Sequence, residues 1–222
     1  MTDREAICAR HSVRAYLEKP IPPELRRELD ALAEQCNRES GLHIRVIYDD
    51  PAGYDFFLTH YGVFRNVANY IVLAGKKEGD FDFRCGYYGE KLVLLAQKLG
   101  LNTCWTALTF NKKRVRELIP EGESLCMAIA LGYGENQGRQ HRSKRPEQIS
   151  ELAGAAPDWF REGLEAALLA PTAVNQQKFC FGLEGETPTV RVKGIGSCLK
   201  VDLGITALHF ELGSGKKVKI LG

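Results

Sequence analysis

The stretch LLAPTAVNQQKFCF, residues 168–181, joins the end of an alanine-rich helical run to the start of an alternating strand. An earlier stretch, LDALAEQCNRESGLHIRV (29–46), has the same plan. In both, apolar residues recur at helical spacing before the junction and alternate after it. The pair predicts an α+β protein in which the element order starts again near the C-terminus. The alternative is that the order recurs only because any α+β protein repeats helix–strand units.

Further helices and strands are expected in the first part of the chain. A helix is expected to begin near Pro23, because proline is favoured in the first helical turn. The run 69–76 is continuously apolar, as in a central strand, and an apolar helix from Gly86 is expected to end at Gly100. We divide the chain into a first half, residues 1–148, and a shortened second half, residues 149–222, intertwined as one globular unit.

Composition excludes several classes of protein. The chain has 222 residues, of which 44% are hydrophobic and 26% are charged, with a net charge of +2. These values suit a globular protein with a sizeable core and predict no nucleic-acid partner. The seven cysteines form no CxxC pair, so we expect a reducing compartment and no metal site. No apolar run is long enough for a membrane span or a signal peptide, so we expect a cytoplasmic protein without a membrane partner.

Two short motifs carry the chemistry. RHSVR (10–14) puts two arginines around a serine, and APTAVNQQ (170–177) puts a polar cluster between a helix and a strand. No Ser-His-Asp order, P-loop or strand-linked GxGxxG is present, which excludes the commonest hydrolase and dinucleotide-binding motifs. Arginine binds phosphate in a fork geometry, and asparagine offers both a donor and an acceptor.

These motifs, taken in order with GEKLVLLAQKLGLNTCWTAL (89–108), VRELIPEGESLCMAIALGYG (115–134) and RSKRPEQI (142–149), resemble the FMN-dependent nitroreductase family. The resemblance covers nearly the whole chain. It implies a nitroreductase-like α+β fold, with central mixed or antiparallel sheets flanked by helices. It also implies that FMN is the cofactor and that NADH or NADPH is the electron donor.

The chain departs from this family in where one motif lies. Ordinary members carry the Pro-Ser-x-x-Asn motif after the first helix, but that place is taken here by EQCNRESG (34–41). In ordinary homodimers one subunit supplies the Arg-x-Ser-x-Arg arm and the other supplies the Asn loop. The chain therefore resembles a subgroup in which a dimer is fused into one polypeptide with a truncated second copy. We expect one complete flavin site per chain, in a monomer with an internal pseudo-two-fold axis or in a homodimer.

The resemblance assigns roles to particular residues. Arg10 and Ser12 suit the phosphate and ribityl end of FMN, and Arg14 suits the pyrimidine edge of the ring. Backbone groups of Ala107 or Leu108 would face flavin N5. The expected cofactor-binding residues are Arg10, His11, Ser12, Arg14, Ala107, Leu108, Arg142, Lys144, Pro171, Thr172, Asn175 and Gln177. For the arginines the plain alternative is a solvated surface, and for His11 it is local packing.

The resemblance implies an FMN-dependent oxidoreductase. Hydride would pass from NAD(P)H through flavin N5 to a nitroaromatic, a quinone or a similar electron-poor small molecule. The flavin carries the chemistry, so no catalytic side chain is named. The alternative is a non-catalytic flavin-binding protein, such as a sensor or a carrier. The sequence names neither the physiological substrate nor the choice between NADH and NADPH.

Overall fold

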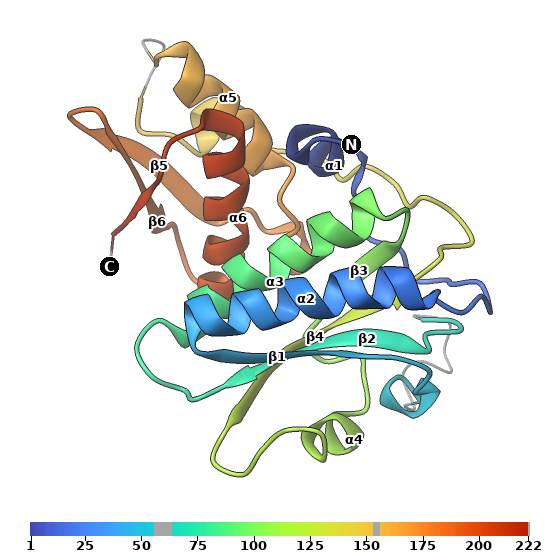
Figure 1. Cartoon of the computed structure of the whole chain (residues 1–222). Helices are drawn as coiled ribbons and strands as arrows, with labels where there is room; N and C mark the ends of the chain where they lie inside the picture. Colours follow the sequence, from blue (N-terminus) through green and yellow to red (C-terminus); the bar gives the residue numbers. More distant parts are fainter. Residues whose placement is uncertain (56–63, 153–155, 222) are drawn as a thin grey trace. The chain divides into compact units, whose positions relative to one another are not determined.

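The computed structural model describes residues 1–55, 64–152 and 156–221 (Figure 1). The chain folds into two compact units. Neither unit is continuous in sequence. Unit 1 consists of residues 1–9, 82–91 and 141–222, and unit 2 consists of residues 10–81 and 92–140. The boundary expected after residue 148 lies close to the start of the last segment of unit 1.

Unit 2 is built on a four-stranded antiparallel sheet in the order β1-β2-β4-β3. Every residue of the central strand β2 is buried, in agreement with its continuous apolar run. Figure 1 shows helix α2 running along this sheet, beside β1. The elements are α2 (Pro23–Ser40), β1 (Leu42–Ile47), the 3₁₀ turn η1 (Pro51–Gly53), β2 (Asn69–Gly75), β3 (Asn102–Thr106), α4 (Lys112–Arg116) and β4 (Ser124–Gly132).

Helix α2 shows how local sequence sets the ends of an element. It begins at Pro23, as expected from sequence. It buries Leu29, Ala33 and Cys36 on one face. It ends at Gly41, where φ is 68° and the backbone N–H donates to the carbonyl oxygen of Asn37. Glycine suits this position because a left-handed conformation carries no Cβ penalty there.

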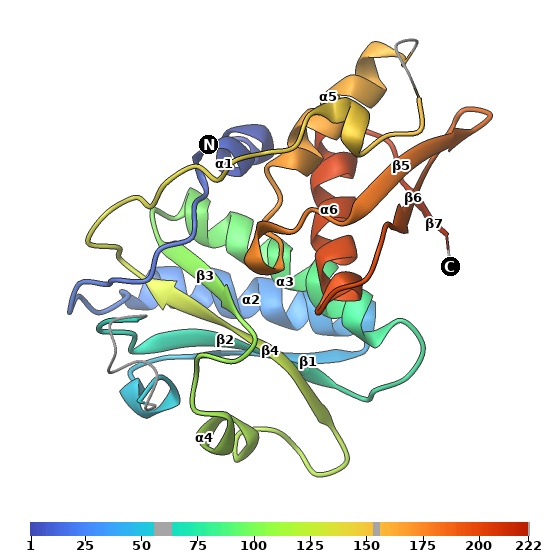
Figure 2. The ribbon, with the colours of Figure 1, turned by 180° about the vertical axis from the view of Figure 1, so that it is seen from behind.

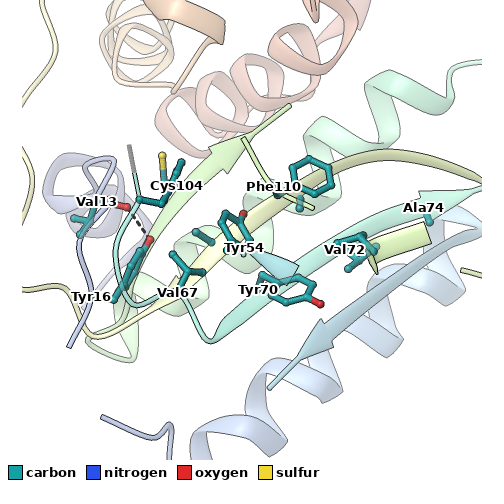
Figure 3. Close-up of a cluster of buried hydrophobic side chains, with 13 residues drawn as sticks. Val13, Tyr16, Tyr54, Val67, Tyr70, Val72, Ala74, Cys104 and Phe110 are labelled. Carbon is teal, nitrogen blue, oxygen red and sulfur yellow. Dashed lines mark hydrogen bonds between the residues drawn. The ribbon is translucent and has the colours of Figure 1, made fainter. Parts of the chain in front are cut away.

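The core of unit 2 contains aromatic rings and short aliphatic side chains (Figure 3). Tyr54 makes an edge contact with Phe64, the ring centroids being 5.4 Å apart. Tyr16 is 1% exposed, and its hydroxyl donates to the carbonyl oxygen of Val13 at 2.7 Å. This bond joins Val13 of the RHSVR motif to Tyr16 just after it, and it thereby fixes the C-terminal end of the motif.

Unit 1 packs helices on a three-stranded sheet in the order β5-β6-β7, which Figure 2 shows from behind. Strands β5 and β6 are antiparallel, and β6 and β7 are parallel. The rings of Phe181 and Phe210 stack with their centroids 4.4 Å apart, which joins β5 to α6. The elements are α1 (Asp3–Ala9), the 3₁₀ turns η3 (Pro146–Gln148) and η4 (Ala173–Asn175), α5 (Asp158–Leu168), β5 (Phe179–Glu184), β6 (Thr187–Val192), α6 (Leu199–Ser214) and β7 (Lys219–Ile220).

Helix α3 (Phe81–Lys98) contributes residues to both units. The helix begins at Phe81, five residues before Gly86, where its start was expected from sequence. Gly100 adopts φ +75° directly after the helix, so its predicted role as a stop is confirmed. The segment that follows forms strand β3.

The predicted α+β fold with antiparallel sheets and flanking helices is confirmed. The order helix, strand, strand, helix occurs in α2-β1-β2-α3 and again in α5-β5-β6-α6. That order is all the structure shows of the internal repeat, which stays a prediction. Among the described residues, no helix combines the length and the apolar character needed to cross a membrane.

Candidate functional site

The RHSVR motif lies in unit 2 as an extended segment beside strand β3. Ser12 forms a parallel bridge with Thr103, and the backbone N–H of Val13 donates to the carbonyl oxygen of Thr103 at 3.0 Å. The carbonyl oxygen of Arg14 accepts from the backbone N–H of Arg65 at 2.9 Å. Because side chains alternate along an extended chain, Arg10, Ser12 and Arg14 lie on the face opposite to Val13.

The thiol of Cys104 on β3 reports the neighbourhood of this segment. Burial raises its pKa, while the charge of Arg14, a hydrogen bond with Ser12 and the charge of Arg10 act in the opposite direction. The charges of Arg10 and Arg14 and the Ser12 side chain therefore all act on Cys104. Arg10 is only 4% exposed, whereas Arg14 is exposed. A nearly buried guanidinium is rare among arginines, and it argues against a purely solvated role for Arg10.

The other residues expected in unit 2 take different positions. Ala107 and Leu108 follow the end of β3 directly, on the segment that continues from the strand bridged at Thr103. Leu108 is 67% exposed. His11 lies against Gly138, where an added Cβ would approach the His11 Cβ to 2.7 Å. The His11 position thus agrees with the alternative of local packing.

The APTAVNQQ motif lies in unit 1, where it connects α5 to β5 and includes the 3₁₀ turn η4. We name residues 171–177 the Asn loop. The loop closes on itself, because the backbone N–H of Asn175 donates to the Thr172 carbonyl oxygen at 2.9 Å and that of Gln177 donates to Thr172 Oγ1 at 3.1 Å. Pro171 precedes this closed turn and is half-buried.

The basic segment 142–144 lies against the Asn loop. Asn175 Nδ2 donates to the carbonyl oxygen of Arg142 at 2.8 Å. The backbone N–H of Lys144 donates to Gln177 Oε1 at 2.7 Å, and Lys144 Nζ donates to the Gln177 carbonyl oxygen at 2.6 Å. The structure therefore brings together the six residues expected in this unit, Arg142, Lys144, Pro171, Thr172, Asn175 and Gln177.

These bonds give Lys144 a role within the protein. Its ammonium group is held by backbone carbonyl oxygens of residues 176 and 177. Desolvation lowers its pKa, and the charges of Lys193 and Lys178 lower it further. Lys144 thus secures the Asn loop while adding to a local excess of positive charge.

The Asn loop has an unusual backbone. Val174, Asn175 and Gln177 all have positive φ, at 46°, 55° and 45°. Asparagine tolerates this region, but a β-branched valine there is an outlier. Val174 is also 95% exposed, so burial of its side chain does not offset the strain. Backbone strain of this kind clusters at functional sites, where the surrounding structure holds it in place.

Sequence reasoning missed a carboxylate that binds this loop. Asp202, in the first turns of α6, is 5% exposed and accepts hydrogen bonds from the Asn loop. Burial raises its pKa to about 6, against the opposing effect of these bonds. The signal was a single acidic residue in the otherwise apolar run VDLGITALHF (201–210). His209 in the same helix is fully buried, and its ring nitrogens lie 3.1 Å from the Ala166 carbonyl oxygen and 2.9 Å from Glu90 Oε1.

The residues present fit the expected cofactor by the chemistry of their donors. A phosphate dianion and a hydroxylated chain need cationic and hydroxyl groups, which Arg10 and Ser12 supply on one face of unit 2. A flavin ring that takes up negative charge needs a nearby cation, and Arg14 lies one step further along that face. Within residues 1–55, 64–152 and 156–221, no group of His, Cys, Asp or Glu side chains could hold a metal ion.

Comparison with known proteins gives one family. The model of a family described as "Putative TM nitroreductase" matches residues 4–214. No curated protein matches the sequence. Among solved structures, a "putative nitroreductase" from Thermotoga maritima MSB8 is 22% identical with a TM-score of 0.72, over 98% of this chain and 87% of that chain.

Two further structures share the fold over a smaller part of this chain. A "Putative NADH dehydrogenase/NAD(P)H nitroreductase" from Parabacteroides distasonis ATCC 8503 is 22% identical with a TM-score of 0.52, over 68% of this chain and 98% of that chain. A "nitroreductase-like protein" from Streptococcus mutans is 11% identical with a TM-score of 0.57, over 67% of this chain and 96% of that chain. At these identities the likeness concerns the fold alone.

Proposed function

Because this chain belongs to the family described as "Putative TM nitroreductase", and is thus an oxidoreductase of the nitroreductase family, we propose that it uses FMN to reduce an electron-poor small molecule. The substrate class is a nitroaromatic, a quinone or a similar compound, and the electron donor is NADH or NADPH. When bound, FMN supplies the hydride-transfer chemistry.

One observation carries this proposal: Arg10, Ser12 and Arg14 lie on one extended segment that bridges strand β3 at Thr103, next to Cys104. A cationic fork and a hydroxyl suit the phosphate and ribityl groups. Because Arg10 is nearly buried, its rotamers are already restricted, and less entropy is lost when it binds an anion. Arg14 is exposed and is available to a group at the surface of this strand.

The other expected residues have supporting roles in the proposal. Backbone N–H groups at Ala107 or Leu108 would orient the flavin ring, a role in which side-chain identity is free. In unit 1, the Asn loop would offer the amide of Asn175, which already donates to the carbonyl oxygen of Arg142. The residues of the RHSVR motif lie in unit 2 and those of the Asn loop lie in unit 1, so a substitution in one group tests that group alone.

The first experiment measures flavin binding. The purified protein should be yellow, and the released cofactor should run as FMN in chromatography. Arg10→Ala should weaken FMN binding by about tenfold or more, as expected for a lost charged hydrogen bond. Arg38→Ala is the matched control, because Arg38 lies in the same unit, is exposed and pairs with Glu34 at 4.0 Å. A colourless protein without micromolar affinity for FMN contradicts the proposal.

The second experiment measures turnover. NADH or NADPH oxidation should be accelerated by menadione or nitrofurazone. A protein that binds FMN but oxidises neither nucleotide with these acceptors is instead the non-catalytic flavin-binding alternative. A single assay therefore separates the two functions once binding is established.

A further inference from the structure

Asp202 is held against the Asn loop by more than one bond. Its carboxylate accepts the backbone N–H of Ala173 at 3.0 Å to Oδ1 and 3.2 Å to Oδ2. It also accepts Gln176 Nε2 at 2.7 Å through Oδ2. The same amide nitrogen donates to the Ser197 carbonyl oxygen at 2.8 Å, on the turn before α6. One buried side chain thus anchors two points of a loop that lies 26 to 29 residues away in sequence.

The two anchor points flank the strained part of the loop. Ala173 precedes Val174 and Asn175, and Gln176 follows them. Both enclosed residues have positive φ, which costs free energy for residues other than glycine. A loop of this kind keeps its conformation only if the residues around it are fixed. The bonds to Asp202 meet this requirement, because they fix the chain on either side of Asn175.

We propose that Asp202 is a positioning residue, which holds the Asn loop in the conformation that presents Asn175 to the cofactor. The inference rests on the proposed function, since it takes FMN as the group that Asn175 meets. Asp202 itself need not touch the cofactor. It acts through Ala173 and Gln176, and its loss should free the loop without removing any group that binds FMN.

The charge state of Asp202 gives this arrangement a pH dependence. The ionised carboxylate is the stronger acceptor for both N–H donors. Burial raises its pKa to about 6, while the bonds from Gln176 and Ala173 oppose that rise. Helices α3 and α5 pack against α6, and no charged residue of these three helices is among the causes of the shift. The anchor is therefore strongest above about pH 6 and weakens below it.

The first test is the affinity of the protein for FMN. Asp202→Ala should raise the Kd for FMN by about tenfold at pH 7.5, since a lost hydrogen bond to a charged group has at least this effect. Asp202→Asn keeps one acceptor oxygen and should raise the Kd less. It should also reduce the increase in Kd that is expected for the unaltered protein between pH 7 and pH 5, leaving only the part due to protonation of the FMN phosphate. Asp158→Asn is the matched control, because Asp158 is a carboxylate of unit 1 with an 85% exposed side chain.

The second test needs no flavin. In the FMN-free protein, hydrogen exchange at the amides of residues 173–177 should be about tenfold faster in Asp202→Ala, and unchanged in Asp158→Asn. Exchange in the core strand β5 reports whether the variant is folded. If Asp202→Ala does not fold, Asp202→Asn and the pH dependence of the unaltered protein provide the same readouts.

The outcomes separate this inference from the proposed function. If the unaltered protein binds no FMN, the proposed function fails and the inference falls with it. If FMN binds normally but Asp202→Ala leaves either its Kd or the exchange of the Asn loop unchanged, the inference alone is wrong. Weaker binding together with faster loop exchange, and neither change in Asp158→Asn, supports it.

Discussion

Asn175 Nδ2 lies 2.8 Å from the carbonyl oxygen of Arg142, and this bond joins two sequence motifs that are 33 residues apart. The Asn175 side chain is also engaged at its other end, because Oδ1 accepts from Gln177 Nε2 at 3.1 Å. The amide is therefore oriented before any cofactor arrives, so less conformational entropy is lost when the loop binds a ligand.

The number of flavin sites follows from the number of motifs. RHSVR and APTAVNQQ each occur once, whereas two complete sites would need two of each. Titration of the FMN-free protein should therefore saturate at about one FMN per chain. Light scattering should show a monomer, as expected if one chain holds a whole site. Saturation at two flavins per chain would mean that the fused-dimer interpretation is wrong.

Arg14 should tune the flavin rather than hold it. A positive charge at the pyrimidine edge favours the reduced, negatively charged ring over the oxidised one. A charged hydrogen bond contributes about 1.5–3 kcal/mol, and about 30 mV corresponds to 1.4 kcal/mol for a two-electron couple. Arg14→Ala should thus lower the midpoint potential by roughly 30–65 mV, as measured by spectroelectrochemistry with excess FMN.

Arg10→Ala is the comparison for this measurement. A phosphate contact affects oxidised and reduced flavin almost equally, so this variant should bind FMN more weakly with a nearly unchanged potential. Arg10 and Arg14 belong to the same segment and carry the same charge. A difference between the two variants therefore reports which part of the cofactor each arginine contacts. An unaltered potential in Arg14→Ala would show that Arg14 does not lie at the pyrimidine edge.

The contact between Glu90 and His209 should be essential for the stability of unit 1. Both side chains are fully buried, with His209 Nε2 2.9 Å from Glu90 Oε1. Loss of one partner of such a pair leaves a buried polar group uncompensated, at a cost of about 1–3 kcal/mol. Glu90→Ala should lower the free energy of unfolding by this amount in urea titrations, and Glu90→Gln by less. In the exposed pair of Arg38 and Glu34, Arg38→Ala should change it by less than about 1 kcal/mol.

Val174 should be a site where a smaller side chain stabilises the protein. It is 95% exposed and has a φ of 46°, so its side chain gains little from packing and strains the backbone. Val174→Gly should raise the free energy of unfolding by about 1 kcal/mol, the usual cost of a left-handed conformation. Ile195 is an equally exposed aliphatic residue without positive φ, at 92%. Ile195→Gly should give no gain, and a gain in both variants would exclude backbone strain as the cause.

Asp202 should make stability fall as the pH rises from about 4 to about 6. Its pKa in the folded protein is raised to about 6, so the folded state retains a proton that the unfolded state has already lost. The penalty for ionising the buried carboxyl is on the order of 3 kcal/mol, since each pKa unit corresponds to about 1.4 kcal/mol. Chemical denaturation across this range should show the decline in the unaltered protein and a flatter profile in Asp202→Asn.

Sequence alone determined the local features of the protein. Pro23 marked the start of α2, the apolar run at 69–76 marked a central strand, and Gly100 marked the end of α3. Each of these features depends on residues within a few positions of one another, through helix capping, side-chain periodicity and the conformational freedom of glycine. The roles of the two short motifs, including Arg10 and Asn175, came instead from the resemblance to a family, and they stay predictions.

Only the tertiary structure decided which of these residues meet. It placed Ser12 beside Thr103 on β3, and it joined Arg142 to Asn175. It also revealed Asp202 as the anchor of the Asn loop, although sequence had shown only an acidic residue in an apolar helix. Such contacts depend on how distant segments pack around a common core, and that packing leaves no periodic signal in the sequence. Burial likewise shifts the pKa of Asp202 only after folding has removed water from around the carboxyl.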